Sequence, residues 1–158
     1  MENLSEASGV IGETTENGLP VIWSFVNELP SEAERASLSW LIVIAWQYDG
    51  SARNGMPSEQ VNQDMLKLED ALEQLEVPGK HVPVYRRTGN GLKEFAFHAR
   101  GTDEFMHSLN VSLASHSPYP IEIKFYEDGE WSDFRRLLAD FDPTQQAIQP
   151  DRAKTQLR

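Results

Sequence analysis

The stretch from Ser39 to Tyr48, which reads SWLIVIAWQY, constrains the fold of this chain more than any other. Its side chains are apolar on both alternating faces, as expected for a central strand that is covered on each side. The apolar run is also far shorter than the roughly 20 residues that a membrane-spanning helix needs. We therefore expect a globular fold built around this strand.

An amphipathic helix is expected next, after a loop over Asp49 to Pro57. Ser58 stands where a helix N-cap belongs, and Pro78 and Gly79 end the helix. Between them, apolar residues recur at alternating spacings of four and three, namely Val61, Met65, Leu68, Leu72 and Leu75. These positions form one stripe on a helix, so we expect this face to pack on the core.

A β-hairpin follows the helix. Val82 to Thr88 and Lys93 to Arg100 have strand composition, and residues 89–91 between them, Gly-Asn-Gly, tolerate the positive φ of a hairpin turn. Pro83 has no amide hydrogen to donate to a neighbouring strand. We therefore expect the first strand of this hairpin at an edge of the sheet.

Three more elements complete the expected core. Thr102 is predicted to cap a second helix, which ends before Pro118. Ile121 to Tyr126 alternates apolar and polar residues, which predicts a strand with one solvated face. A last helix is predicted from about Trp131 until Asp142.

The two ends of the chain differ from this core in composition. Residues 1–18 contain four glutamates and no Lys or Arg, which predicts a loose acidic arm. Leu19 to Val26 is rich in β-forming residues and predicts a strand, joined to the next strand by Asn27 to Leu38. We therefore expect a single α+β domain over residues 19–141 and a polar tail over residues 142–158.

The order of these elements predicts the fold. From Ser39 to Tyr126 it is βαββαβ, the order of a ferredoxin-like split-βαβ sandwich, here with an additional N-terminal strand and a C-terminal helix. The first and third strands of that fold are central, and here they are the two most apolar ones. Since both sides of the first strand are then occupied, Leu19 to Val26 must add at an outer edge, or the strand order must differ.

Composition narrows the classes of function. The net charge is −11, from 14 basic and 25 acidic residues, which disfavours nucleic acid or anionic membrane as the main partner and favours a basic protein or simple solubility. Without cysteine, the chain has no disulfide, thiolate metal site or cysteine nucleophile. Met1 to Glu6 lacks the basic start and apolar run of a secretory signal, so we expect a cytoplasmic protein.

The charge is unevenly distributed along the sequence. Residues 58–76, which cover the first predicted helix, carry a local net charge of −5, and acids near the end of that helix oppose its dipole. Residues 80–100 carry five basic residues and one acidic residue, for a local net charge of +4; the basic ones are Lys80, Arg86, Arg87, Lys93 and Arg100. We therefore expect an electrostatically two-sided molecule.

No catalytic or metal-binding motif is evident. His81, His98, His107 and His116 lack the spacing of metal ligands. His98 shares a strand face with Glu94, but a structural histidine is the favoured interpretation. The acidic turn Glu127, Asp128 and Glu130 is a candidate cation site, yet it lacks EF-hand spacing, and Asp128 is equally suited to cap the following helix.

Aromatic residues suggest two further interpretations. Lys93 to Phe97, KEFAF, resembles the RNA-binding strand of RNA-recognition-motif domains, an interpretation that fails if Phe95 and Phe97 lie beneath the helices. Trp46, Tyr48 and Met56 lie where the central strand runs into a loop, and Trp131 follows the acidic turn. These residues either form anchors beside acids at one end of the sheet or belong to the core.

Several short motifs resemble a known family. Gly55-Met56-Pro57, Leu68-Glu69-Asp70, the strand from Tyr119 to Ile123 and the turn of Asp128 and Trp131 resemble the bacterial family catalogued as domain of unknown function 695, over about residues 19–141. This resemblance implies no catalytic residues. More distantly, the fold and acidity resemble the regulator of ribonuclease activity B, a protein inhibitor of an RNA-degrading enzyme.

We therefore expect a non-enzymatic cytoplasmic interaction protein that binds and inhibits a basic partner such as a nuclease, with no cofactor and no metal. The predicted partner-binding residues are Glu69, Asp70, Glu73, Glu76, Trp46, Tyr48, Met56, Glu127, Asp128, Glu130 and Trp131. One alternative is a small enzyme or ligand-binding domain with a pocket near Trp46, Tyr48 and His98. Another is an RNA-binding domain. The N-terminal strand is also a candidate edge for a homodimer.

Overall fold

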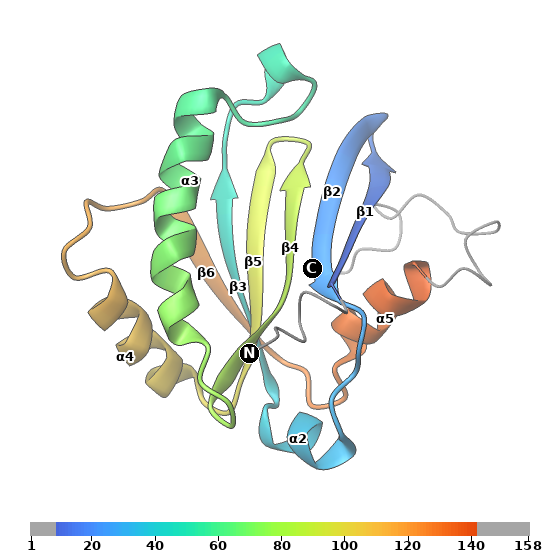
Figure 1. Cartoon of the computed structure of the whole chain (residues 1–158), viewed down its shortest axis with the longest axis vertical. Coiled ribbons are helices and arrows are strands. Elements are labelled where there is room, and N and C mark those ends of the chain that lie inside the picture. Colours follow the sequence, from blue (N-terminus) through green and yellow to red (C-terminus); the bar gives the residue numbers. More distant parts are fainter. Residues whose placement is uncertain (1–8, 142–158) are drawn as a thin grey trace.

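The computed structural model describes residues 9–141, which form one six-stranded antiparallel sheet with helices on both faces (Figure 1). The strands are β1 (Gly9–Glu16), β2 (Leu19–Val26), β3 (Trp40–Gln47), β4 (His81–Gly89), β5 (Leu92–Ala99) and β6 (Ile121–Glu127). The helices are α2 (Glu32–Ser37), α3 (Glu59–Leu72), α4 (Thr102–Ser112) and α5 (Ser132–Asp140), with short 3-10 turns η1 (Ser51–Arg53) and η2 (Glu73–Leu75).

The ferredoxin-like prediction is confirmed in the middle of the chain. The order β3-α3-β4-β5-α4-β6 is βαββαβ, and these four strands lie side by side as β4-β5-β3-β6. The predicted central strands β3 and β5 are indeed neighbours, and β3 is flanked on its other side by β6. Ser58 caps α3 as predicted, since its Oγ accepts a hydrogen bond from the Val61 amide.

The N-terminal region departs from the prediction. β2 adds outside β4, and β1 adds outside β2, so the sheet gains two N-terminal strands instead of one. The predicted loose arm is therefore wrong over Gly9–Glu16, while residues 1–8 lie outside the described range. Asn17 and Gly18 both have positive φ and connect β1 to β2 as a hairpin turn. This Asn-Gly pair is a strong hairpin signal, and it specifies β1 and β2 despite the acidic composition of the segment.

The β4 strand is not at an edge, contrary to the prediction from Pro83. β2 pairs with β4 only from Val21–Gly89 to Phe25–Tyr85, and Pro83 lies beyond that ladder at an irregularity in the β4–β5 register. β2 therefore has no position that needs an amide hydrogen from Pro83. Two smaller differences are the helix α2 within the predicted connection and Gly101, instead of Thr102, as the N-cap of α4.

Both faces of the sheet are buried, which explains the doubly apolar β3. Ile42, Ile44 and Trp46 face α3 and α4 in one cluster. Leu41 and Val43 face α5 and the residue that follows α2, Leu38, in a second cluster with residues of β2 and β4. The C-terminal helix thus covers the face that α3 and α4 leave open.

On the α5 side of the sheet, a buried ion pair connects β1 to β4 across β2. Arg87 is 2% exposed, and its Nη2 lies 2.9 Å from Oε1 of Glu16. Nη1 donates to the carbonyl oxygen of Leu92 at 3.1 Å, and the guanidinium lies over the Trp23 ring. Arg87 is therefore buried, and its assignment to a basic surface was wrong.

Among the described residues, none of the helices is long and apolar enough to cross a membrane.

Candidate functional site

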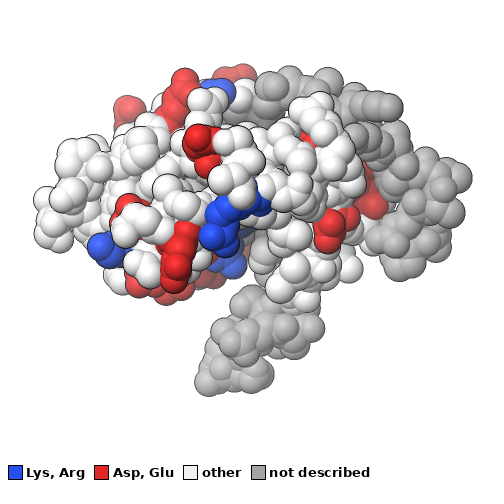
Figure 2. All heavy atoms as spheres, turned by 90° about the horizontal axis from the view of Figure 1, so that it is seen from above, with Lys and Arg blue, Asp and Glu red and all other residues white. Residues whose placement is uncertain are grey.

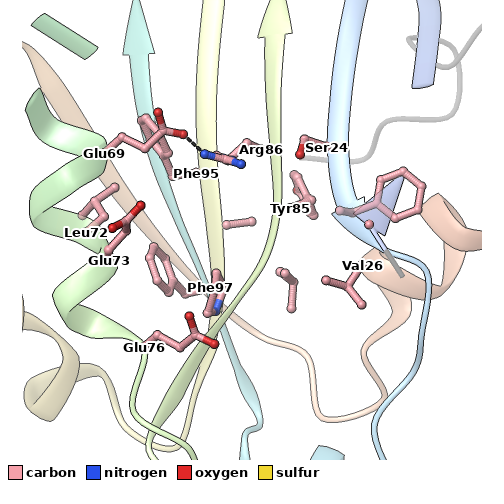
Figure 3. A pocket seen from close by; sticks show the side chains of 15 residues that line it. Ser24, Val26, Glu69, Leu72, Glu73, Glu76, Tyr85, Arg86, Phe95 and Phe97 are labelled. Atoms are coloured by element: carbon pink, nitrogen blue, oxygen red, sulfur yellow. Dashed lines mark ion pairs between the residues drawn. The ribbon is translucent and has the colours of Figure 1, made fainter. Parts of the chain in front are cut away.

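A cavity of about 420 Å³ lies between α3 and the strands β2 and β4; we call it the acidic groove (Figure 3). Glu69, Glu73 and Glu76 line its α3 side, and Ser24, Val26 and Arg86 line its strand side. Leu72 and Phe97 are also among the lining residues. The groove exists because the layer of α3 and α4 packs on β3 and β5, and the buried cluster beneath it includes no residue of β1, β2 or β4.

Helix geometry aligns the three glutamates. Glu69 lies on α3, Glu73 follows four residues later as its C-cap and the first residue of η2, and Glu76 is the C-cap of η2, so all three lie on one side of this helical segment. Glu69 forms an ion pair with Arg86 on β4, and burial lowers the pKa of Arg86. Glu73 and Glu76 are exposed, and no ion pair to either is found within residues 9–141. The groove therefore keeps two carboxylates that are not neutralised by an ion pair in the described part of the chain.

A smaller set of residues continues the groove toward η1. The pair Ile22–Thr88 lies two residues along from the pair Ser24–Arg86 and on the same face of the sheet. This pair lines a second cavity of about 580 Å³ together with Met56, Glu59 and Asn62. The predicted residue Met56 thus belongs to the extension of the groove.

The loop that carries Met56 is held against the β4–β5 turn. Gly55 has a φ of +89°, and its carbonyl oxygen accepts hydrogen bonds from the Gly91 amide at 3.0 Å and the Tyr48 hydroxyl at 2.7 Å. A Cβ at this position would lie 2.9 Å from the Asn90 amide nitrogen. Gly55 of the Gly-Met-Pro motif therefore holds the loop against the β4–β5 turn, at a position where a side chain would not fit.

The basic segment does not form a free surface. Arg100 pairs with Glu104 at 2.8 Å, Lys80 lies 3.9 Å from the same carboxylate, and Arg87 is buried. Lys93 donates to the Thr88 hydroxyl at 2.8 Å and lies over the Phe95 ring. Burial and the Arg86 charge lower the pKa of Lys93 to about 8. Acidic and basic side chains also adjoin each other at the η1 end of the molecule (Figure 2).

The predicted cluster of aromatic anchors and acids does not form. Trp46 pairs with Ile121 at one end of the β3–β6 ladder, whereas Glu127 pairs with Trp40 at the other end. Six residues of strand, or about 20 Å, separate these positions. Trp46 and Trp131 are 4% and 0% exposed, so both belong to the core. Asp70 is exposed and does not line the groove.

The acidic turn is explained by helix capping. Asp128 accepts hydrogen bonds from the Ser132 amide at 2.8 Å and the Asp133 amide at 3.2 Å, at the start of α5. Asp128 thus binds the first two amides of α5, as the capping interpretation requires, although the N-cap position itself is Trp131. Glu127 and Glu130, which flank Asp128 in the turn, are exposed. In the described part of the chain, no three His, Asp or Glu side chains gather closely enough to hold a metal ion.

His98 is a buried structural residue. Its Nδ1 lies 2.8 Å from the Leu38 carbonyl oxygen, which makes Nδ1 the protonated nitrogen, and its ring stacks on Trp131 at 3.9 Å. Its Nε2 lies 3.9 Å from Asp128 and has no hydrogen-bond partner among the described residues. Burial lowers the pKa of His98. His98 and Trp46 belong to opposite faces of the sheet, so His98 is not part of the predicted pocket at the sheet end, whereas Trp46 and Tyr48 both line a cavity there.

The RNA-binding interpretation fails its own test. Phe95 and Phe97 are 2% and 3% exposed, and both lie in the core cluster beneath α3 and α4. The Phe97 ring contacts Phe105 of α4 with ring centroids 5.1 Å apart. These rings offer no surface for base stacking.

Comparison with known proteins gives a family and no function. The sequence model described as "Family of unknown function (DUF695)" matches residues 13–139. No curated protein and no solved structure matches the chain.

Proposed function

This chain belongs to the DUF695 family, and we propose that it is a non-enzymatic cytoplasmic protein whose acidic groove binds a basic segment of a protein partner. The observation that carries this proposal is the pair of exposed carboxylates, Glu73 and Glu76, beside an apolar lining that includes Leu72 and Val26. Arg86 in the groove lining is bound to Glu69, and the extension of the groove adds one basic residue, Arg53.

The shape of the groove favours a chain segment over a small molecule. From the Ile22–Thr88 pair to Val26, the groove follows four residue steps of β2, or about 13 Å. That length accommodates about four extended residues or two helical turns. Apolar side chains of the segment would contact Leu72 and Val26, and its basic side chains would reach Glu73 and Glu76.

A nuclease is one class of partner that fits this chemistry. Nucleic-acid sites carry basic side chains that contact phosphates, and an acidic protein that covers them would inhibit the enzyme. The net charge of −11 would accelerate the encounter with such a basic surface and help to orient it.

A charge-reversal experiment tests the proposal. Tagged wild-type protein and the variant Glu73→Lys/Glu76→Lys would be compared in capture from cytosol at low and high ionic strength. The control Asp103→Lys/Glu122→Lys makes the same change in net charge at exposed positions that do not line the groove. We expect a partner that the wild type and the control retain, that high salt releases, and that the groove variant loses.

The nuclease form of the proposal has a separate readout. The captured partner would be assayed for RNA cleavage with increasing amounts of each variant, and we expect inhibition by the wild type and the control alone. Equal capture by the groove variant, or equal loss in both double variants, would mean that the groove does not select the partner.

A further inference from the structure

A third cavity, of about 730 Å³, lies at the sheet end where β3 finishes, away from the acidic groove. The end of β3, the first half of α3 and the loop between α4 and β6 enclose it. We call it the aromatic pocket and define it by Trp46, Tyr48, Asp49, Asp64, His116 and Tyr119. It shares no lining residue with the groove. Its volume is within the range of about 300–1,000 Å³ that small-molecule sites occupy.

Hydrogen bonds and ring contacts hold the aromatic walls in place. The Tyr119 ring packs against Trp46 with centroids 5.6 Å apart, and its hydroxyl lies 2.7 Å from Nδ1 of His116. The Tyr48 hydroxyl donates to the Gly55 carbonyl oxygen. Because both phenol groups are bonded within the protein, the rings are ordered before any ligand arrives.

The lining of the pocket carries two acidic side chains, Asp49 and Asp64, and one basic side chain, Lys67. Asp49 accepts hydrogen bonds from the amide and hydroxyl of Ser51, which lower its pKa and keep it ionised at neutral pH. Burial and the charge of Asp64 raise the pKa of Tyr119, so this carboxylate acts on the Tyr119 hydroxyl. Lys67 is the one Lys or Arg in the lining; its ammonium lies 4.0 Å from Asp64, and its side chain is 71% exposed.

We propose that the aromatic pocket binds an organic cation, a protonated amine or a quaternary ammonium group. Aromatic faces attract such cations through their ring quadrupoles; here the half-buried Tyr48 and Tyr119 offer them, with the buried Trp46 ring behind Tyr119. Asp64 and Asp49 supply the opposite charge. An anion would meet two carboxylates and a single exposed ammonium. The cation is either a free metabolite or a lysine side chain of a protein, and this pocket goes beyond the groove proposed above.

A pair of probes with the same shape isolates the role of charge. Choline and its neutral isostere 3,3-dimethylbutan-1-ol would be titrated into the full-length protein while the NMR signals of the Trp46 indole and the Tyr119 ring are followed. We expect saturable shifts with choline and none with the isostere. Equal binding of both, or tighter binding of inorganic phosphate than of choline, would overturn the proposal.

Two substitutions with opposite expected effects provide the second test. Asp64→Asn removes an attractive charge and should weaken choline binding about threefold to fivefold, the range of a partly exposed charge interaction. Lys67→Gln removes the competing ammonium and should tighten binding by a similar factor. The control Asp103→Asn, on α4 and outside the pocket, should change nothing. Weaker binding by Lys67→Gln, or equal effects of Asp64→Asn and Asp103→Asn, would refute the inference.

A short lysine peptide tests whether the bound cation is a free metabolite or a lysine side chain of a protein. Tighter binding of a short lysine peptide than of choline would indicate a protein side chain, and the reverse order a free metabolite. The groove variant Glu73→Lys/Glu76→Lys should leave choline binding unchanged, so failure of one proposal is separable from failure of the other.

Discussion

Removal of Glu16 should destabilise the protein strongly, because it leaves the Arg87 guanidinium buried without a counter-charge. Arg87 is 2% exposed, and without the Glu16 carboxylate its hydrogen-bond partners among the described residues would all be neutral oxygens, the carbonyls of Leu92 and Gly89 and, in Glu16→Gln, the amide oxygen of the new side chain. Loss of one member of a buried ion pair costs about 3–5 kcal/mol. Since Glu16 belongs to the edge strand β1 and its side chain is 12% exposed, water reaches the site when β1 frays, and we expect the lower end, about 3 kcal/mol.

The assay is urea unfolding of Glu16→Gln followed by tryptophan fluorescence, with Trp23 over the guanidinium as a local reporter. A loss of about 3 kcal/mol corresponds to a fall in Tm of roughly 10 °C for a domain of this size. The control Glu104→Gln removes an exposed ion pair to Arg100 and should have a much smaller effect. The double variant Glu16→Leu/Arg87→Met should be more stable than Glu16→Gln. Unchanged stability of Glu16→Gln, or a double variant less stable than the single one, would refute this account of the pair.

Three other expectations concern stability. Gly12→Ala places a Cβ against the Phe141 ring and should cost about 1–3 kcal/mol in urea unfolding. The control Gly129→Ala, whose Cβ would lie 3.8 Å from the Ser39 side chain, should cost much less, and equal effects would contradict the packing argument. Asp128→Ala removes the carboxylate that binds the first two amides of α5 and should cost about 0.5–2 kcal/mol by the same assay. Burial lowers the pKa of His98 in the folded state. As the pH falls through about 6.5, the unfolded state therefore takes up a proton before the folded state does. The free energy of unfolding that depends on the neutral His98 ring is thus fully present above that pH and decreases as the pH falls through it. The stability advantage of the wild type over His98→Asn should therefore shrink on acidification, and a constant difference from pH 8 to pH 5 would rule this out.

The helices and strands that pack through regular stripes were predictable from local pattern. The four-and-three spacing after Ser58 is sufficient for α3, and the Gly-Asn-Gly turn for the β4–β5 hairpin. The β1–β2 hairpin was missed although Asn17 and Gly18 signal it equally locally. Its strand is polar because β1 is an edge strand with one exposed side, and polarity was interpreted as disorder.

The candidate sites were predictable only in part. The acidic face of α3 was evident from Glu69, Glu73 and Glu76, but the pairing of Glu69 with Arg86 depends on where α3 lies over β4. The aromatic pocket joins Trp46 to Tyr119, which are far apart in the sequence, and no spacing rule connects them. Trp131 looked like a surface anchor from its acidic neighbours and is a core residue that stacks on His98.

By itself, the sequence determined the types and the βαββαβ order of the elements from β3 to β6, the doubly buried central strand and the acidic surface of α3. Side-chain periodicity and turn chemistry are properties of neighbouring residues along the backbone, which is why these features were predictable. Only the tertiary structure decided which side of the sheet each helix covers, which end of the sheet each loop occupies, and which charges neutralise one another. Those outcomes depend on strand order and register, which bring together residues that no local pattern relates. The apolar sequence of the central strand therefore predicted a core, whereas the residues that line the acidic groove and the aromatic pocket were identified only from the tertiary structure.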